Sequence, residues 1–223
     1  MGLIHQQAAG QTQSDSSSVL WNLDRMDKIG GCTTTKLGQP VLIETPLGRS
    51  VLFDGIDDGL LITANPLNDA IAFTVEVVFR PDSSGPPNAE QRFLHIQNPD
   101  NENRRILIEL RHFADQRWFL DTFISSDSSR RTLYAETFQH SVGEWFHAAL
   151  LYEKGTMRHY VDGREELSGA VNYDPIKNGC TSIGVRMNRR SWFRGAIRTI
   201  RMTRRALSPA EFLALPTGIR REE

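Results

Sequence analysis

The segment IAFTVEVVFRP, residues 71–81, alternates apolar side chains with a second set of side chains, and this pattern constrains the fold more than any other feature. Successive side chains of a β-strand point to opposite faces, so a period of two predicts a strand with one face in the core. The set predicted to face the core is Phe73, Val75, Val77 and Phe79. The set predicted to face the other way is Thr74, Glu76, Val78 and Arg80.

Short runs of the same kind fill most of the chain between residues 40 and 203, separated by turn residues. We predict a hairpin turn at Lys154-Gly155 and a second turn at Asp162-Gly163. A helix signal stands only near the end, in ALSPAEFLAL (206–215), where Ser208, Pro209 and Glu211 form a capping-box pattern. This order predicts an all-β sandwich or barrel followed by a short C-terminal helical turn.

One domain suffices for this chain, because 223 residues suit a single large β-sandwich and no interior linker is visible. We predict a flexible leader at 1–20, the domain at 21–215 and a tail at 216–223. The net charge of −1 gives no electrostatic reason to expect nucleic acid as a partner. Membrane insertion is not expected either, because no stretch approaches about 20 apolar residues. The N-terminus lacks the layout of a signal peptide.

Four stretches of the sequence resemble motifs of a known protein family. They are SVLFDGIDDGLLI (50–62), FTVEVVFRP (73–81), EWFHAALLYEKGTMRHYVDGREE (144–166) and FRGAIRTIRMTRRALSPAEF (193–212). In this order the chain resembles the laminin-G-like jelly rolls of the concanavalin A-like lectin/glucanase superfamily, over residues 40 to 214. The resemblance implies a two-sheet antiparallel sandwich, and location outside the cell or in the periplasm. Members bind glycans or proteins on the concave face or rim, and some relatives cleave polysaccharides.

Alternation places polar and aromatic side chains on the strand faces that turn away from the core. If these strand faces lie together, their aromatic rings would stack on a sugar while their carboxylates and guanidiniums bind its hydroxyls. The alternative is a solvated sheet face with Glu–Arg pairs across strands. The candidate ligand-binding residues are Glu76, Arg80, His95, Glu109, Arg111, Phe119, Asp121, Phe123 and Trp192. For Trp192 the alternative is a plug over one end of the sandwich.

A catalytic alternative uses acid/base residues on the same face. The Glu-x-Asp-x-x-Glu strand motif of the superfamily's retaining glucanases is absent here, and so is a Gly-x-Ser-x-Gly elbow. A polysaccharide-cleaving hydrolase or lyase would therefore draw on Glu76, Glu109 and His95, the last as a base near neutral pH.

Metal and disulfide sites have weaker signals. Calcium is the ion that the resemblance implies, and Asp54, Asp57 and Asp58 offer oxygen ligands, but Asp-Gly turns need no metal. We predict no cofactor, with calcium as the alternative. Cys32 and Cys180 form either one disulfide or two free thiols. The leading hypothesis is a secreted, non-catalytic carbohydrate-binding module; the rivals are the enzyme and a protein-interaction module.

Overall fold

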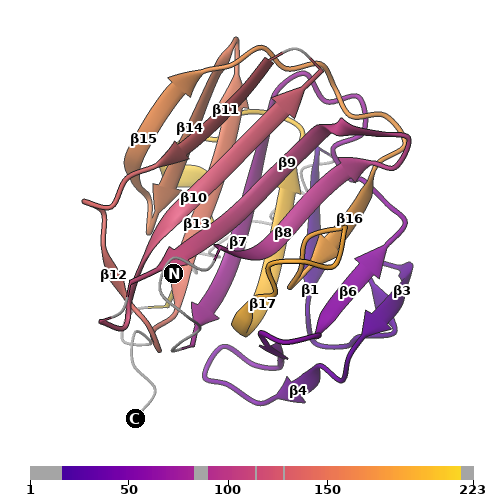
Figure 1. The fold of residues 1–223 in the computed structure, drawn as a ribbon, viewed down its shortest axis with the longest axis vertical. Coiled ribbons are helices and arrows are strands. Elements are labelled where there is room, and N and C mark those ends of the chain that lie inside the picture. Colours follow the sequence, from indigo (N-terminus) through magenta and orange to yellow (C-terminus); the bar gives the residue numbers. More distant parts are fainter. Residues whose placement is uncertain (1–16, 83–89, 114, 128, 217–223) are drawn as a thin grey trace, which may run out of the picture.

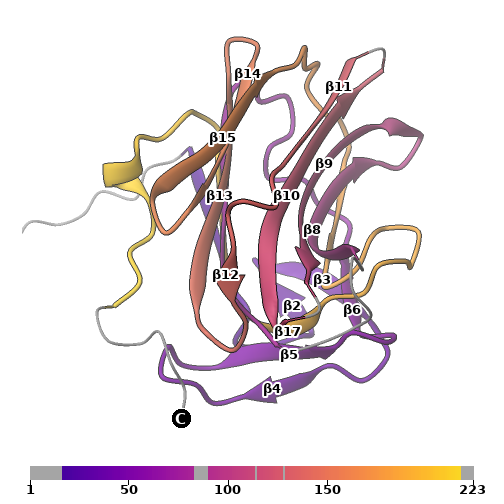
Figure 2. The ribbon, with the colours of Figure 1, turned by 60° about the vertical axis from the view of Figure 1, so that its left-hand side comes forward.

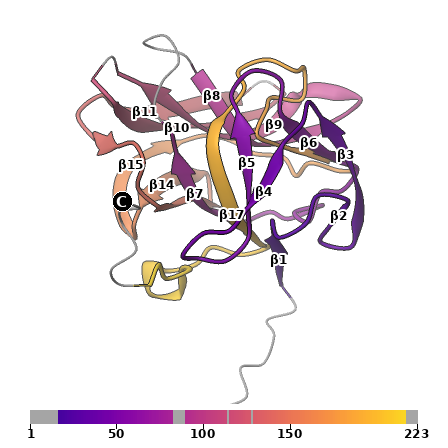
Figure 3. The ribbon, with the colours of Figure 1, turned by 90° about the horizontal axis from the view of Figure 1, so that it is seen from below.

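The computed structural model describes residues 17–82, 90–113, 115–127 and 129–216. Within these residues seventeen strands form two antiparallel sheets stacked face to face (Figures 1 and 3). The predicted two-sheet antiparallel sandwich is confirmed. Strand β1 (Ser18–Asn22) lies partly inside the predicted leader and pairs with β17, whereas residues 1–16 and the predicted tail from 217 onward lie outside the described residues.

The first sheet contains eight strands in the described part of the chain. Its central strand β7 corresponds to the alternating segment that opened the sequence analysis. The order is β15 (Arg164–Ala170), β14 (Thr156–Val161), β13 (Phe146–Glu153), β7 (Phe73–Pro81), β17 (Arg194–Thr203), β5 (Ser50–Asp54) and β4 (Val41–Ile43), with β1 beside β17.

The second sheet contains nine strands, again counting the described residues only. Its longest strands, β8 to β10, form a meander that faces the viewer in Figure 1. The order is β11 (Ser129–Tyr134), β10 (Arg117–Ser126), β9 (Asn101–His112), β8 (Glu90–Asn98), β16 (Cys180–Ile183), β6 (Gly59–Ile62), β3 (Cys32–Leu37) and β2 (Lys28–Ile29), with β12 (His140–Ser141) beside β10.

Aromatic side chains from both sheets meet in the core. Phe79 of β7 stacks on Phe93 of β8, with ring centroids 4.4 Å apart, and lies edge-on to Trp118 of β10 at 5.3 Å. Phe193, directly before β17, closes the group at 5.5 Å from Phe93. These rings bury large apolar areas and fix the spacing of the two sheets, which leaves the outer faces for other roles.

The two predicted hairpin turns are present. Lys154 and Gly155 between β13 and β14 have φ values of 48° and 80°, and Asp162 and Gly163 between β14 and β15 have 49° and 78°. Two consecutive residues with positive φ suit the right-handed twist of the flanking strands, and glycine takes the second position without steric cost.

The C-terminal segment folds back over the outer face of the first sheet. Its 3-10 turn, η1 (Pro209–Glu211), begins with the predicted capping pair, in which the Ser208 N–H donates to the Glu211 carboxylate at 2.8 Å. The turn lies beside the first sheet, on the side away from the second (Figures 2 and 3). In the described residues no helix has the length and apolar character needed to cross a membrane.

Candidate functional site

The sheets divide the predicted ligand-binding residues into two groups. Glu76 and Arg80 lie on β7 of the first sheet, whereas His95 lies on β8 of the second. Five more lie on the same sheet as His95, namely Glu109 and Arg111 on β9 and Phe119, Asp121 and Phe123 on β10. The expectation that all of them share one face is therefore wrong for Glu76 and Arg80. The outer faces of two stacked sheets point in opposite directions, and period-two alternation does not say to which sheet a strand belongs.

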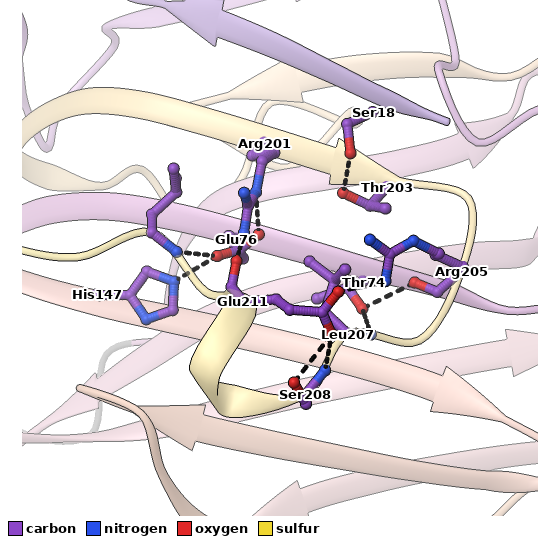
Figure 4. A network of polar contacts seen from close by, with 11 residues as sticks. Ser18, Thr74, Glu76, His147, Arg201, Thr203, Arg205, Leu207, Ser208 and Glu211 are labelled. Atoms are coloured by element: carbon purple, nitrogen blue, oxygen red, sulfur yellow. Dashed lines mark hydrogen bonds and ion pairs between the residues drawn. The ribbon is translucent and has the colours of Figure 1, made fainter. Parts of the chain in front are cut away.

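Glu76 holds the C-terminal segment against the first sheet. Its fully buried carboxylate accepts hydrogen bonds from His147 Nε2 at 3.0 Å, from the Leu213 N–H at 2.7 Å and from Arg201 (Figure 4). Burial by itself raises the pKa of Glu76, but the hydrogen bonds from His147, Arg201 and Leu213 outweigh it and leave the pKa below its ordinary value. Glu76 is thus covered by the protein itself. Its neighbour Arg80 pairs with Asp82 at 3.1 Å.

The second sheet carries a compact cluster of charged side chains on its outer face. Asp121 and Glu109 are directly opposite each other on β10 and β9, and Glu109 is directly opposite Arg92 on β8. Arg111 donates to Asp121 at 2.7 Å and to Glu90 at 2.8 Å. The Arg92 Nε lies 2.5 Å from Glu109 Oε2, close enough for an ion pair but not aligned for a hydrogen bond. Glu90 and Arg92 were not among the residues predicted from the sequence.

The two buried carboxyl groups of this cluster hold protons more tightly than usual. Burial, and then the charge of Asp121, raise the pKa of Glu109 to about 8. Burial also raises the pKa of Asp121 to about 6, although the hydrogen bond from Arg111 acts in the opposite direction. Two carboxylates side by side in a site of low polarity cannot both ionise cheaply, so Glu109 keeps its proton at neutral pH. A protonated carboxyl can donate a hydrogen bond to a ligand as well as accept one.

His95 is a fixed part of this face and not an exposed base. It is fully buried, and its Nδ1 accepts a hydrogen bond from the Met187 N–H at 2.9 Å. Burial, and then the charges of Arg186, Arg105 and Arg92, lower the pKa of His95 to about 3. The imidazole is therefore neutral at neutral pH and far from the pKa of an efficient general base. Of the three residues from which the catalytic alternative draws its pair, Glu76 lies on the other sheet, whereas Glu109 and His95 lie on neighbouring strands of the second sheet.

Two aromatic rings beside the cluster remain partly open to solvent. Phe123 on β10 is half-buried, with the Arg105 guanidinium 5.1 Å from its ring centroid. Tyr134 on β11 is 52% exposed, with the Arg111 guanidinium also at 5.1 Å. Tyr134 was missed in the sequence, although it is directly opposite Asp121.

The other two predicted aromatics are placed differently. Phe119 is 1% exposed and packs against Phe113, with 5.1 Å between the ring centroids. Trp192 is half-buried at the other end of the sheet, where its ring would lie 3.4 Å from a Cβ added to Gly59 at the start of β6. Three strands of the sheet separate β6 from β10.

In the acidic turn after β5, backbone N–H groups donate to the carboxylates of Asp54 and Asp58. Side-chain oxygens of Asp54, Asp57 and Asp58 lie within 4.8 Å of one another. Asp54 accepts N–H bonds from the turn, the shortest from Ile56 at 2.8 Å, and Asp58 accepts from Gln39 at 2.7 Å and Asp54 at 3.0 Å. Calcium requires six to eight oxygens. Because backbone N–H groups already occupy oxygens of Asp54 and Asp58, the residues fit a turn better than a calcium site.

The two cysteines are free thiols, and the sheet order explains why. Cys32 lies on β3 and Cys180 on β16, and β6 lies between these strands. Two strand spacings amount to about 9–10 Å, whereas a disulfide joins Cα atoms about 4.4–6.8 Å apart. The disulfide alternative is therefore not realised.

Known proteins share this architecture. Domain 4 of AbnA, a GH43 extracellular arabinanase from Geobacillus stearothermophilus solved with arabinotriose, superposes with a TM-score of 0.63 at 18% identity, covering 86% of this chain and 94% of that domain. The binding domain of botulinum neurotoxin DC, in complex with SialylT, gives 0.63 at 14% identity over 87% and 50% of the two chains. The CBM40 of a Ruminococcus gnavus IT-sialidase, bound to alpha2,3 sialyllactose, gives 0.54 at 15% identity over 78% and 95%.

At these identities the superpositions establish the fold alone. No curated protein matches the sequence. A family model, Laminin_G_3, matches residues 54–212, which is more than half of the chain and includes the central strands of both sheets. The chain therefore belongs to the concanavalin A-like lectin/glucanases superfamily.

Proposed function

We propose that this protein is a non-catalytic carbohydrate-binding module that uses the outer face of its second sheet. The observation that carries the proposal is the arrangement of Phe123 and Tyr134 on neighbouring strands, each beside a guanidinium and both next to the carboxyl groups of Glu109 and Asp121. Aromatic rings stack on the apolar face of a pyranose, and the charged groups bind its hydroxyls. Relatives of the same fold have been solved with arabinotriose and sialyllactose, which supports the ligand class.

The comparison of the two sheets favours this face over the opposite one. The outer face of the first sheet is covered around Glu76 by the C-terminal segment, whose Phe212 packs on His147 and Tyr160 with ring centroids 5.5 and 5.2 Å away. On the second sheet, Tyr134 is exposed and Arg105, Arg111 and Phe123 are half-buried. A glycan can therefore reach these side chains of the second sheet from solvent.

The same geometry supports the proposal of binding without cleavage. The carboxyl groups of Glu109 and Asp121 interact with Arg92 and Arg111, respectively. The neutral His95 ring accepts a hydrogen bond from the Met187 N–H. The proposal also includes function outside the cytoplasm, by analogy with the extracellular arabinanase relative.

The test is a screen of the full chain against neutral and acidic polysaccharides, in which retention and product formation are read together. We expect retention with no new reducing ends or unsaturated products. Phe123→Ala should lose retention, whereas Phe138→Ala should keep it; Phe138 is a matched control, half-buried beside Arg164 at 5.9 Å. Retention that survives Phe123→Ala and Tyr134→Ala would contradict the proposed face, and product formation would favour the enzyme alternative.

A further inference from the structure

The connection between β16 and β17 is fixed onto the outer face of the second sheet. The Gly184 N–H donates to the Phe93 carbonyl at 3.1 Å, and the Arg92 N–H donates to the Ser191 carbonyl at 2.9 Å. Between these anchors the Met187 N–H donates to His95 Nδ1. The connection and the β8–β9 hairpin project from the same side of the sheet (Figure 2). The loop is therefore held in place, and it brings Arg186 close to His95 and Arg105.

This loop end of the face carries several guanidinium groups that form no ion pair within the described part of the chain. Among the described residues, Arg186, Arg189 and Arg190 form no ion pair, and the Arg105 guanidinium donates to the backbone carbonyl of Glu102 instead of to a carboxylate. Arg92 and Arg111, by contrast, both pair with acids at the other end of the cluster. Burial, and then the neighbouring charge of Arg186, lower the pKa of Arg105, although the carboxylates of Glu102 and Glu109 act in the opposite direction. A bound anion would relieve the repulsion between these like charges.

Two buried donors at the same place also lack acceptors. Because His95 Nδ1 accepts a hydrogen bond, the single proton of the neutral ring is on Nε2, which has no acceptor among the described residues. The Nε of Arg105 is likewise without one. Buried polar groups are normally satisfied, so a group of orphaned donors beside unpaired guanidiniums indicates a missing acceptor. Arg105 also stands beside Phe123, the proposed stacking ring.

We propose that the second sheet recognises an acidic glycan, whose carboxylate or sulfate binds Arg105 and Arg186 while the sugar ring contacts Phe123. This inference rests on the proposed function and narrows its ligand class. Arg105 and Arg186 are half-buried, so their outer N–H groups can reach a ligand. His95 is a positioning residue, because it holds the loop through Met187. Oxyanions suit guanidinium groups because charge-assisted hydrogen bonds are roughly twice as strong as neutral ones.

The experiment measures affinity of the full chain for three polymers with one backbone: dextran, carboxymethyl dextran and dextran sulfate. We expect at least one charged polymer to bind about tenfold or more tightly than dextran, and the preferred charged form identifies the oxyanion. Arg105→Gln and Arg186→Gln should each weaken that binding about tenfold. Arg204→Gln is the matched control, because Arg204 is an exposed arginine after β17 that forms no ion pair with any residue the structure describes; it should change affinity less than about twofold.

Two results would overturn the inference. Equal affinity for all three polymers, including no affinity for any of them, would show that no anion is selected. An equal loss in Arg204→Gln and Arg186→Gln would show that only net charge matters. If the three polymers bind equally while a glycan is retained in the polysaccharide screen and Phe123→Ala abolishes that retention, the proposed function stands while the acidic-ligand inference fails.

Discussion

Asp121 and Glu109 are directly opposite each other on β10 and β9, and both are buried on the outer face of the second sheet. Side chains directly opposite across an antiparallel pair have Cβ atoms about 4.5–5.5 Å apart, so the two carboxyl groups share one environment. The proton on Glu109 and the guanidinium groups of Arg92 and Arg111 together limit the charge repulsion within this pair.

The raised pKa of Glu109 predicts a dependence of stability on pH. The unfolded chain releases this proton near pH 4.5, whereas the folded chain keeps it until about pH 8. The folded state therefore binds more protons in this window, and the contribution of Glu109 to stability falls as pH rises through it. Glu109→Gln cannot titrate, so its free energy of unfolding should improve relative to wild type from pH 5 to pH 8.5. Urea unfolding at both pH values measures this.

A matched control for that experiment is Glu44→Gln, because Glu44 is exposed and pairs with Arg49 at the surface. The difference in free energy of unfolding between Glu44→Gln and wild type should be the same at both pH values. A Glu109→Gln variant that loses stability relative to wild type as pH rises would contradict the raised pKa.

Glu76 should matter for stability and not for glycan binding. Glu76→Ala removes the acceptor for Arg201, His147 and Leu213 and leaves a guanidinium without its partner. Breaking a buried pair in this way costs about 3–5 kcal/mol. Glu44→Ala, which breaks an exposed pair, should cost about 0–1 kcal/mol. Denaturant unfolding gives both values, and an unchanged stability of Glu76→Ala would refute the role of Glu76 in holding the C-terminal segment.

The aromatics of the second sheet should separate into a structural and a binding group. Phe119→Ala should lower the free energy of unfolding by about 3–5 kcal/mol, because its ring is enclosed against Phe113. Tyr134→Ala should change stability by less than about 0.5 kcal/mol, since the ring is exposed, and should weaken glycan retention. Thermal unfolding and affinity electrophoresis on both variants distinguish the two. Wild-type retention by Tyr134→Ala would remove it from the binding group.

Reductant should leave the thermal stability unchanged, because Cys32 and Cys180 are separate thiols. Both are half-buried, so iodoacetamide should alkylate two thiols in the folded, unreduced protein, as measured by intact mass. A mass that shifts only after reduction would reveal a disulfide.

Local patterns predicted much of the fold. The alternation of 71–81 predicted which side chains of β7 enter the core, and Phe73, Val75, Val77 and Phe79 lie there. The turns at Gly155 and Gly163 and the pairing of Ser208 with Glu211 were also readable, because each depends on residues close in the chain.

The site was less predictable because it depends on contacts between distant segments. Alternation could not assign Glu76 to the first sheet, and nothing local shows that the C-terminal segment covers it. On β8, an irregularity between Arg92 and Leu94 shifts the register, so Arg92 and His95 come to neighbour Glu109 and Leu107 although they are three residues apart. A bulge of this kind breaks the period of two, which explains why Arg92 was missed.

The most direct test of recognition by the second sheet is a two-dimensional NMR titration of the isotope-labelled full chain with an oligosaccharide retained in the screen. We predict that the amide chemical shifts of β8 to β11 and of the loop 184–193 change, while those of residues around Glu76 on β7 do not. Perturbations confined to the first sheet, or to the turn at Asp54–Asp58, would contradict the assignment of the outer face of the second sheet as the binding surface.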